Sequence, residues 1–298
     1  MASNPVLVGF GPGALHNLIF IFLYCILYAM NDLPIYGIHP VEELLAARKQ
    51  DIEHVYFDRD KKSAALFGIL RVCRRDRLSY NLVPEAKLNA LAGTMRHQGV
   101  VAFCSARPYN GAEDLEAIVR SKPAPLFVVA ASIEDGGNMG AIIRSCVCLG
   151  ADALLLERKN TVPLNAAVAK SSAGMIEHLC IVKPRSLEGL IGDLVEKRGF
   201  SVVGADVEDD KNVDSDKIKD KVKGKNKGVS PDKVDFRKPT ILVVGGENRG
   251  IPPYLQKLCG KTVSIPMAQN GRGQSLNASV AAGVLMYECM RQREFNTK

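Results

Sequence analysis

Three segments of the chain place polar side chains directly after predicted strands, where they could orient a bound substrate. In the first segment, Asn138 and Arg144 stand six residues apart at the start of a predicted helix. Because long helical side chains lean toward the N-terminal end of their helix, the Arg144 guanidinium can reach back toward Asn138. The alternative is purely structural, with Asn138 as a helix cap and Arg144 as a surface residue.

The other two segments combine turns with small and polar residues. Residues 245–250 read GGENRG and place Glu247 after two glycines, which let backbone come close to a ligand. Residues 265–267 read IPM and are followed, after a loop, by SLN at 275–277. In this third segment Ser275 can cap the last predicted helix. No phosphate-binding glycine loop accompanies these segments.

Apolar runs that alternate with predicted helices place the three segments at one edge of a sheet. Short, continuous apolar strands of this kind are typical of a mostly parallel sheet that is covered on both faces. Ligands bind at the carboxyl ends of such strands, so we expect an α/β fold with its site there. The predicted strands are 126–131, 153–156, 178–182, 201–205, 241–244 and 262–265.

A smaller α/β unit is predicted over residues 35–110, and it is basic. Residues 48–98 hold 11 basic and 6 acidic side chains, so their net charge is 11 − 6 = +5. Guanidinium groups match phosphate oxygens, and binding them releases counterions. Four arginines within seven residues are therefore a candidate RNA-binding patch, with a solvated helix face as the alternative: Arg71, Arg74, Arg75 and Arg77.

Composition excludes several classes of protein. The 298 residues are 47% hydrophobic and 24% charged, which fits neither a disordered chain nor a multi-span membrane protein. The eight cysteines are too sparse for a disulfide scaffold and contain no Cys-x-x-Cys pair. Structural zinc is therefore not expected, no metal site is predicted, and a reducing compartment is favoured.

Residues 1–34 are predicted to be a leader of uncertain role. Thirteen apolar residues run unbroken over 18–30, fewer than the roughly 20 that span a bilayer. The cationic region of a signal peptide and the arginines of a presequence are absent. A divergent leader or a buried helix is favoured over a membrane anchor. The G-x-G-x-x-A pattern at 9–14 formally fits a dinucleotide-binding turn, but Pro12 within it argues against that function.

Two further segments complete the predicted domain plan. Residues 111–125 are predicted to form a helix and connector that link the small unit to a catalytic domain over 126–298. Residues 206–238 interrupt that domain with nine acidic and ten basic side chains. Such a segment buries too little apolar surface to offset its chain entropy, so a disordered insertion is predicted. A lysine-rich segment that touches RNA is the alternative.

The order of the three polar segments resembles the signature motifs of one enzyme family. Asn138 with Arg144, GGENRG at 245–250, and IPM with SLN over 265–277 are similar to the motifs of the SpoU (TrmH-like) family in the SPOUT superfamily, the RNA 2′-O-ribose methyltransferases. Upstream, YGIHPV at 36–41 is similar to the start of a ribosomal-protein-like RNA-binding domain. That domain precedes the catalytic domain in the guanosine-specific enzymes of large-subunit ribosomal RNA, mitochondrial ones included.

The resemblance implies a fold that periodicity alone would not suggest. The C-terminal strands and helix would be tied into a deep trefoil knot, and true knots are essentially absent from other proteins. It also implies a homodimer and S-adenosylmethionine as the methyl donor. Cofactor contacts, largely through backbone groups, would come from Gly245, Gly246, Ile265, Met267 and Leu276.

The resemblance also implies a set of catalytic residues around the target ribose. In the family mechanism Arg144 activates the 2′-hydroxyl. A guanidinium has a pKa above about 12 and is a poor general base at neutral pH. Neutralising a neighbouring phosphate and the developing alkoxide is a less demanding role for it. The residues that would order the site around Arg144 are Asn138, Glu247, Ser275 and Asn277.

The leading hypothesis is methylation of a guanosine ribose in large-subunit ribosomal RNA. Three alternatives stay open: a transfer RNA methyltransferase of the same family, a non-catalytic RNA-binding protein, and a membrane-tethered factor. The lysine-rich insertion suggests a eukaryotic chain, in which such an enzyme would serve the mitochondrial ribosome. A mitochondrial location is therefore expected, with the cytoplasm as the alternative. The sequence does not identify the methylated nucleotide.

Overall fold

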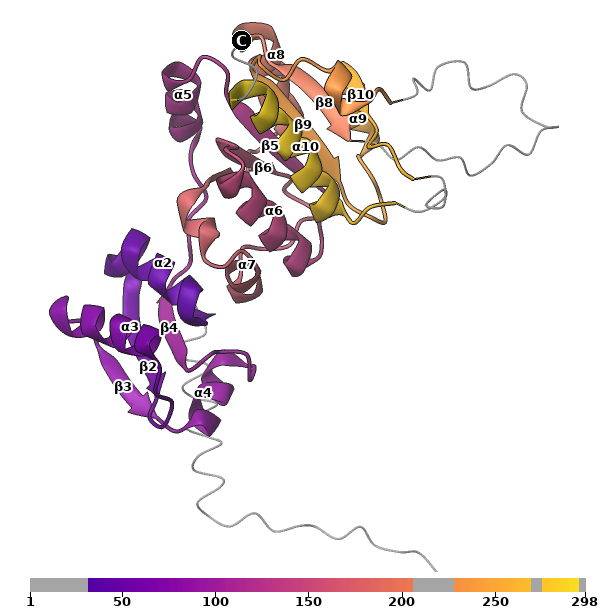
Figure 1. Cartoon of the computed structure of the whole chain (residues 1–298). Helices are drawn as coiled ribbons and strands as arrows, with labels where there is room; N and C mark the ends of the chain where they lie inside the picture. The colour runs from indigo at the N-terminus through magenta and orange to yellow at the C-terminus, as the bar shows by residue number, and fades with distance from the viewer. Residues whose placement is uncertain (1–31, 206–227, 269–274, 295–298) are drawn as a thin grey trace, which may run out of the picture.

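The computed structural model describes residues 32–205, 228–268 and 275–294, which form two α/β units (Figure 1). Figure 1 shows the smaller unit as a separate lobe that is followed along the chain by the larger one. The G-x-G-x-x-A pattern at 9–14 and the apolar run at 18–30 lie outside the described residues. Within the described ranges, no helix is long and apolar enough to cross a membrane.

The first unit is built on a four-stranded mixed sheet. Its strand order is β1-β4-β2-β3, in which β2 and β3 are parallel and the other pairs are antiparallel. The elements are β1 (Asp32–Tyr36), α2 (Ile38–Arg48), η1 (Lys49–Asp51), β2 (Ile52–Asp58), α3 (Ala64–Arg75), β3 (Tyr80–Val83), α4 (Glu85–Ala92) and β4 (Val100–Ser105).

The second unit is built on a six-stranded sheet in which every described pairing is parallel. The strand order is β10-β8-β9-β5-β6-β7. The elements are α5 (Ala112–Ser121), β5 (Leu126–Ala131), α6 (Gly136–Cys148), β6 (Ala153–Leu156), α7 (Ala166–Ser171), η2 (Met175–His178), β7 (Cys180–Val182), α8 (Leu187–Arg198), β8 (Ser201–Ala205), η3 (Pro231–Lys233), β9 (Thr240–Gly245), α9 (Pro253–Leu258), β10 (Lys261–Val263) and α10 (Ala278–Glu294).

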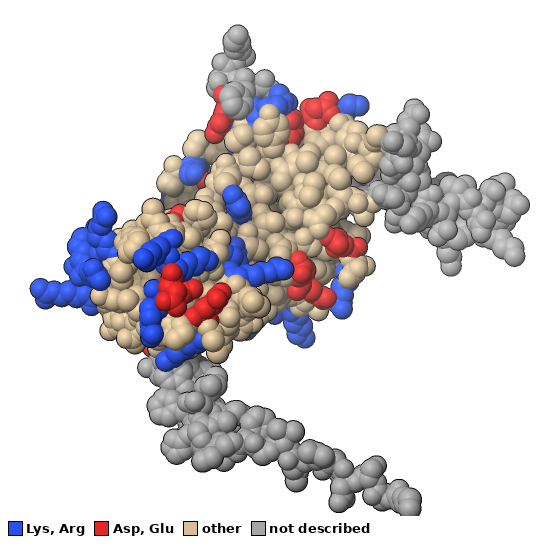
Figure 2. Space-filling model, turned by 60° about the horizontal axis from the view of Figure 1, so that its bottom comes forward, with Lys and Arg blue, Asp and Glu red and all other residues tan. Residues whose placement is uncertain are grey.

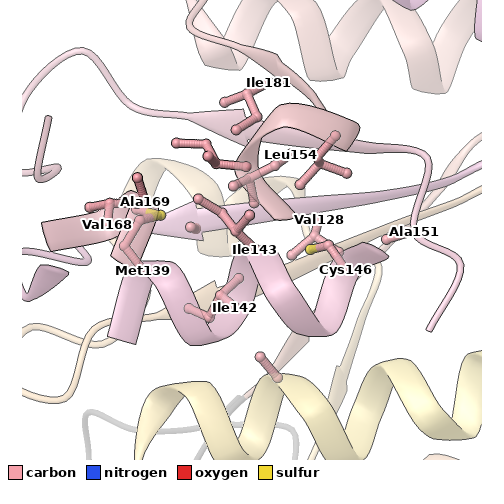
Figure 3. Close-up of a cluster of buried hydrophobic side chains, with 14 of the residues drawn as sticks. Val128, Met139, Ile142, Ile143, Cys146, Ala151, Leu154, Val168, Ala169 and Ile181 are labelled. Atoms are coloured by element: carbon pink, nitrogen blue, oxygen red, sulfur yellow. The ribbon is translucent and has the colours of Figure 1, made fainter. Parts of the chain in front are cut away.

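Alternation along the central strand β5 divides the core into two layers, because successive side chains point to opposite faces of a sheet. Val128 and Ala130 belong to the layer that contains α6, α7 and α10, whereas Phe127 and Val129 face α5, α8 and α9. Figure 3 shows the first layer, with Ile143 of α6 among buried side chains of the sheet. The predicted parallel sheet with both faces covered is confirmed.

The two units share one hydrophobic cluster and a buried ion pair. Ile35 and Leu44 of the first unit belong to the same cluster as Ile176 of the second. Arg48 of α2 donates to both carboxylate oxygens of Glu177 in η2, at 2.7 and 3.2 Å, and the Glu177 side chain is only 4% exposed. Charges in such an environment require close partners, so this contact fixes the two units against each other.

Three predicted boundaries differ from the structure. Residues 228–238 were predicted to lie in a disordered insertion, yet Phe236 is fully buried and its N–H donates to Gln292 Oε1 at 3.0 Å. Apolar side chains spaced among the charges allow this part of the segment to pack. The predicted leader overlaps β1, which pairs with β4 from Asp32 onward. The predicted linker contains α5, whose Leu115 is buried against the six-stranded sheet.

Sequence reasoning also missed an edge strand. The strand β3 ends at Val83, and α4 begins after Pro84 at Glu85. The trefoil knot implied by the resemblance stays a prediction. The chain between β10 and α10 passes through residues 269–274, which lie outside the described residues.

Candidate active site

Helix α6 begins with an aspartate cap that leaves the Asn138 side chain available. The Asp135 carboxylate accepts the Asn138 backbone N–H at 2.7 Å, so Asp135 is the N-cap and Asn138 lies in the first turn. The structural alternative, in which Asn138 caps the helix, is therefore wrong. The Asn138 side chain instead reaches a residue 109 positions later in the chain.

Three predicted site residues form one hydrogen-bonded cluster, which we call the amide–carboxylate cluster. Asn138 Nδ2 donates to Glu247 Oε1 at 3.1 Å, and Asn277 Nδ2 donates to Asn138 Oδ1 at 2.9 Å. Asn277 Nδ2 also donates to Glu247 Oε1. The cluster joins the first turn of α6 and the start of α10 to the turn after β9, and the strands that precede them, β5, β10 and β9, belong to one parallel sheet.

Glycines bring the turn after β9 against the turn after β5. The Gly246 N–H donates to the Ala131 carbonyl at 2.9 Å, and a Cβ on Gly246 would collide with the Ser132 carbonyl oxygen. A Cβ on Gly245 would likewise collide with the backbone of Gly250. Glycine is therefore required at both positions for these turns to pack, and the predicted contact of the two glycines with a cofactor stays a prediction.

The start of α10 also differs from the prediction. Asn277 is the residue that caps α10, since its Oδ1 accepts the backbone N–H of Ser279 at 2.9 Å and that of Val280 at 3.4 Å. Ser275, predicted to be the cap, is exposed two residues earlier. Asn277 thus uses its oxygen to hold the helix and its nitrogen to hold the amide–carboxylate cluster.

Arg144 is exposed on α6 and makes no hydrogen bond or ion pair in the part of the chain that the structure describes. Six residues separate it from Asn138, which corresponds to about 9 Å along the helix axis. Its long side chain is therefore unrestrained and can move toward a ligand near the first turn of α6.

An open pocket of about 320 Å³ lies beside the cluster. Its walls come from the turns after β5 and β9, and Glu134 and Arg249 face each other at 3.7 Å among the residues that line it. Of the residues predicted to contact the cofactor, only Gly246 lines this pocket, together with Ser132, Ile133, Glu134, Asp135, Asn138, Glu247, Asn248 and Arg249.

The other predicted cofactor residues lie at the ends of nearby elements. Gly245 ends β9, Ile265 and Met267 follow β10, and Leu276 precedes α10. Ile265 and Leu276 are half-buried, and Met267 is 45% exposed. Apolar side chains of this kind cover the aromatic face of a nucleoside, so the chemistry of these three residues fits a cofactor that carries an adenine ring.

The predicted RNA-binding arginines lie on the first unit, at the C-terminal end of α3 and just beyond it. Arg74 lies over the Tyr80 ring and donates to its hydroxyl at 3.1 Å. Arg75 pairs with Asp76 at 2.7 Å, which reduces its net contribution to a positive patch. Arg71 and Arg77 are exposed. Figure 2 shows Lys and Arg side chains gathered over this unit, at the left of the view.

The described residues contain no group of three or more His, Cys, Asp or Glu side chains that could hold a metal ion. The cysteines in the described ranges form no disulfide with one another.

Sequence reasoning missed two residues that shape this edge of the sheet. Ser132 adopts a left-handed backbone conformation with φ of 55°, and the buried Glu157 accepts its N–H at 2.7 Å. The position of Glu157 directly after an apolar strand could have marked it as a candidate site residue. No pattern in the sequence indicated its partners.

Comparison with known proteins identifies both units. Residues 125–287 match the SpoU rRNA Methylase family, and residues 34–110 match a family described as RNA 2′-O ribose methyltransferase substrate binding. The 23S rRNA (guanosine-2′-O-)-methyltransferases RlmB of Ralstonia nicotianae and Acinetobacter baylyi are 30% and 29% identical to this chain. The alignments cover 86% and 87% of this chain and 94% and 96% of those proteins.

A solved structure of a SpoU methyltransferase with bound cofactor is also similar to this chain. The SpoU methyltransferase AviRb from Streptomyces viridochromogenes, crystallised with AdoMet, is 25% identical and superimposes with a TM-score of 0.66 over 88% of this chain and 91% of its own. Fold, site and matched domains together define the class, an S-adenosylmethionine-dependent RNA 2′-O-ribose methyltransferase.

The chain belongs to the SpoU rRNA Methylase family and carries, ahead of its catalytic domain, the substrate-binding domain of these enzymes.

Proposed function

We propose that this enzyme methylates the ribose 2′-hydroxyl of a guanosine in large-subunit ribosomal RNA. The observation that carries the proposal is that one chain contains both the amide–carboxylate cluster and a basic substrate-binding domain at 34–110. Relatives of about 30% identity that share both domains are named as 23S rRNA guanosine methyltransferases. The substrate assignment rests on this similarity.

In the proposed mechanism, the amide–carboxylate cluster orients the target ribose, and Arg144 stabilises negative charge beside it. Asn138, Glu247 and Asn277 hold one another through hydrogen bonds, so their remaining polar atoms are already oriented before RNA arrives. Arg144 neutralises the phosphate beside the target and the alkoxide that develops as the 2′-hydroxyl loses its proton. Deprotonation by Arg144 itself would require a strongly perturbed guanidinium pKa.

S-adenosylmethionine supplies the electrophilic methyl group when it is bound. We propose that Gly245, Ile265, Met267 and Leu276 hold it, with Gly246 shaping the adjoining turn. The apolar side chains would cover the adenine ring, and the glycines would keep the turn tight. The contribution of the protein is then to align the ribose oxygen with the cofactor, and such alignment lowers a barrier by several kcal/mol.

We also propose that the enzyme acts as a homodimer through α10. Val280, Val284 and Tyr287 recur at helical spacing on this helix and are 49%, 41% and 52% exposed. Soluble proteins rarely expose such a stripe, and a second copy of the chain is the occupant that the family resemblance implies. Light scattering should give twice the chain mass, and Tyr287→Glu should give monomers.

The second candidate substrate is transfer RNA, and one experiment separates the two. Purified enzyme and labelled S-adenosylmethionine are incubated with ribosomal RNA or with total transfer RNA at equal nucleotide concentration. The proposal predicts label on a ribose of ribosomal RNA, at one guanosine. Efficient transfer to transfer RNA alone would overturn the substrate assignment while leaving the enzyme class intact.

The non-catalytic alternative has its own test. A protein with a vestigial site would give a silent calorimetric titration with S-adenosylmethionine, whereas the proposal predicts saturable heat at one site per chain.

For location, we propose the mitochondrion, with the cytoplasm as the alternative. The support is compositional, because the segment 206–227 is lysine-rich and relatives of this architecture modify bacterial-type ribosomal RNA. Fractionation followed by detection of the native protein distinguishes the two compartments. The membrane-tethered alternative predicts that carbonate extraction leaves the protein in the pellet.

A further inference from the structure

A buried carboxylate at the carboxyl edge of the parallel sheet has no role in the mechanism above. Glu157 directly follows β6 and is 7% exposed. Buried carboxylates are rare unless their oxygens are satisfied by donors, so the partners of Glu157 indicate what it does.

Glu157 links the loop that follows β5 to helix α9 (Pro253–Leu258), the helix after β9. Its Oε2 accepts the Ser132 backbone N–H at 2.7 Å and the Ser132 hydroxyl at 3.4 Å. Its Oε1 accepts the Tyr254 hydroxyl at 2.6 Å. Ser132 begins the loop that leads to Asn138, and Tyr254 lies on α9, which follows the turn that carries Glu247. One carboxylate thus contacts the chain next to two of the three segments that supply the amide–carboxylate cluster.

The Tyr254 hydroxyl remains a donor to Glu157 across the physiological range. Burial and the hydrogen bond to Glu157 raise the pKa of Tyr254, so the phenol stays protonated.

The loop that Glu157 holds adopts a conformation that serine does not favour. Ser132 has φ of 55°, in the left-handed region, where a residue with a Cβ is sterically disfavoured. In this conformation the Ser132 carbonyl oxygen packs against Gly246, next to Glu247. A change in the Ser132 backbone would therefore alter the separation between the loop of Asn138 and the loop of Glu247.

We propose that Glu157 is a positioning residue for methyl transfer. It holds Ser132 in the left-handed conformation and thereby sets the 3.1 Å contact between Asn138 and Glu247. The inference rests on the proposed roles of Asn138 and Glu247 at the target ribose, and it assigns Glu157 no contact with substrate.

The first test is kinetic. Glu157→Ala should lower kcat at least tenfold and leave KM for RNA within about twofold, because phosphate contacts elsewhere dominate RNA affinity. Glu157→Gln should recover most of kcat, since the amide can accept the Ser132 N–H and donate to the Tyr254 oxygen. Glu196→Ala is the matched control, because Glu196 is an exposed carboxylate on α8 and should leave both constants unchanged.

A double-mutant cycle separates positioning from a general loss of stability. Glycine adopts the left-handed conformation freely, so in a Ser132→Gly background the Glu157→Ala change should lower kcat less than threefold further. An Asn138→Ala background should likewise reduce the effect of Glu157→Ala to less than threefold. If the loss of kcat is the same in all three backgrounds and follows the melting temperature, Glu157 is only a structural residue and the proposal is overturned.

Hydrogen exchange of the full-length protein gives a readout that does not depend on activity. The Ser132 amide should be protected in the wild type and in Glu196→Ala, and at least tenfold less protected in Glu157→Ala. Unchanged protection together with unchanged kcat would overturn the proposal. A wild type that transfers no methyl group to any RNA would instead refute the proposed function, while the exchange result would still decide whether Glu157 holds the Ser132 loop.

Discussion

The side-chain amide nitrogen of Asn277 lies 2.9 Å from the side-chain oxygen of Asn138, although 139 residues separate them in the chain. Asn277 begins α10 and Asn138 lies in the first turn of α6, and both also donate to Glu247. The relationship means that three loops, each far from the others in sequence, present one preorganised set of polar atoms. Because these polar atoms are already in place, they need not be reoriented during the catalytic step.

Arg144 should be required for activity and dispensable for folding. It is exposed and has no partner within the described residues, so Arg144→Ala should change the free energy of unfolding by less than about 0.5 kcal/mol. Loss of its charge at the ribose should lower kcat roughly 100-fold or more. Arg144→Lys should also be impaired, because an ammonium lacks the planar fork of a guanidinium. Methyl-transfer assays and thermal melts check both expectations.

Arg120→Ala is the matched control for Arg144. Arg120 lies on α5, near the amino end of β5, and pairs only with the helical neighbour Glu116 at 3.1 Å. An effect on kcat as large as that of Arg144→Ala would show that the assay responds to overall charge, which contradicts the assigned role.

Asn277 should show separate structural and catalytic contributions. Asn277→Ala removes both the cap of α10 and the bonds to the cluster, so it should cost about 1 kcal/mol of stability and lower kcat at least tenfold. Asn277→Ser keeps a capping oxygen and should restore stability without restoring kcat. Urea denaturation and steady-state kinetics measure the two effects. A serine variant with wild-type kcat would exclude a role for the amide nitrogen.

The arginines of the first unit should contribute unequally to RNA affinity. Arg71→Ala should weaken RNA binding and reduce the slope of log affinity against log salt by about 1, because it removes one phosphate contact. Arg75→Ala should have a smaller effect, since Asp76 already pairs with that guanidinium. Binding titrations at several salt concentrations test this. Equal effects of the two variants would argue for a solvated helix face.

Glu177 should be essential for the junction between the two units. Glu177→Ala leaves the guanidinium groups of Arg48 and Arg107 without their shared carboxylate, and loss of one partner of a buried pair typically costs about 3–5 kcal/mol. Glu113→Ala, which removes an exposed carboxylate from α5, is the control. Denaturant unfolding that gives a difference below about 1 kcal/mol would mean that the ion pair does not hold the units together.

His97 should make stability fall in mild acid. Its Nδ1 accepts the Gly99 N–H at 3.0 Å and its Nε2 pairs with Asn89 Oδ1 at 2.9 Å, an arrangement that requires a neutral ring. Burial lowers the pKa of His97 below its ordinary 6.5, so the unfolded state binds the proton more tightly. Its contribution is present above pH 6.5 and is lost as the pH falls below that value.

The test of His97 is the slope of unfolding free energy between pH 7 and pH 5.5. His97→Gln should flatten this slope, whereas the exposed His39→Gln variant should keep the slope of the wild type. A wild-type slope in the His97 variant would assign the acid sensitivity to other groups.

The catalytic sheet was predictable because its strands are short apolar runs between turn residues. The strands at 126–131, 153–156 and 201–205 begin and end where their apolar runs do. Such strands are buried on both faces, so local composition determines them. β3 was missed because this four-residue edge strand has two exposed positions, Asn81 and Leu82, and therefore carries little apolar signal.

The site was predictable in its residues but not in its contacts. Asn138, Glu247 and Asn277 stand in motifs, so their types and order were visible. Which of them caps a helix depends on competition with neighbours, and Asp135 prevails over Asn138 in α6. Glu157 could not be assigned from sequence because its partners, Ser132 and Tyr254, lie 25 and 97 residues away.

The most direct test of the central claim is the position of the transferred methyl group. Ribosomal RNA treated with the enzyme and labelled S-adenosylmethionine is digested to nucleosides and analysed by mass spectrometry. The proposed reaction predicts labelled 2′-O-methylguanosine with the wild type and at least a hundredfold less with Arg144→Ala. Label on a base, or equal labelling by the two proteins, would contradict it.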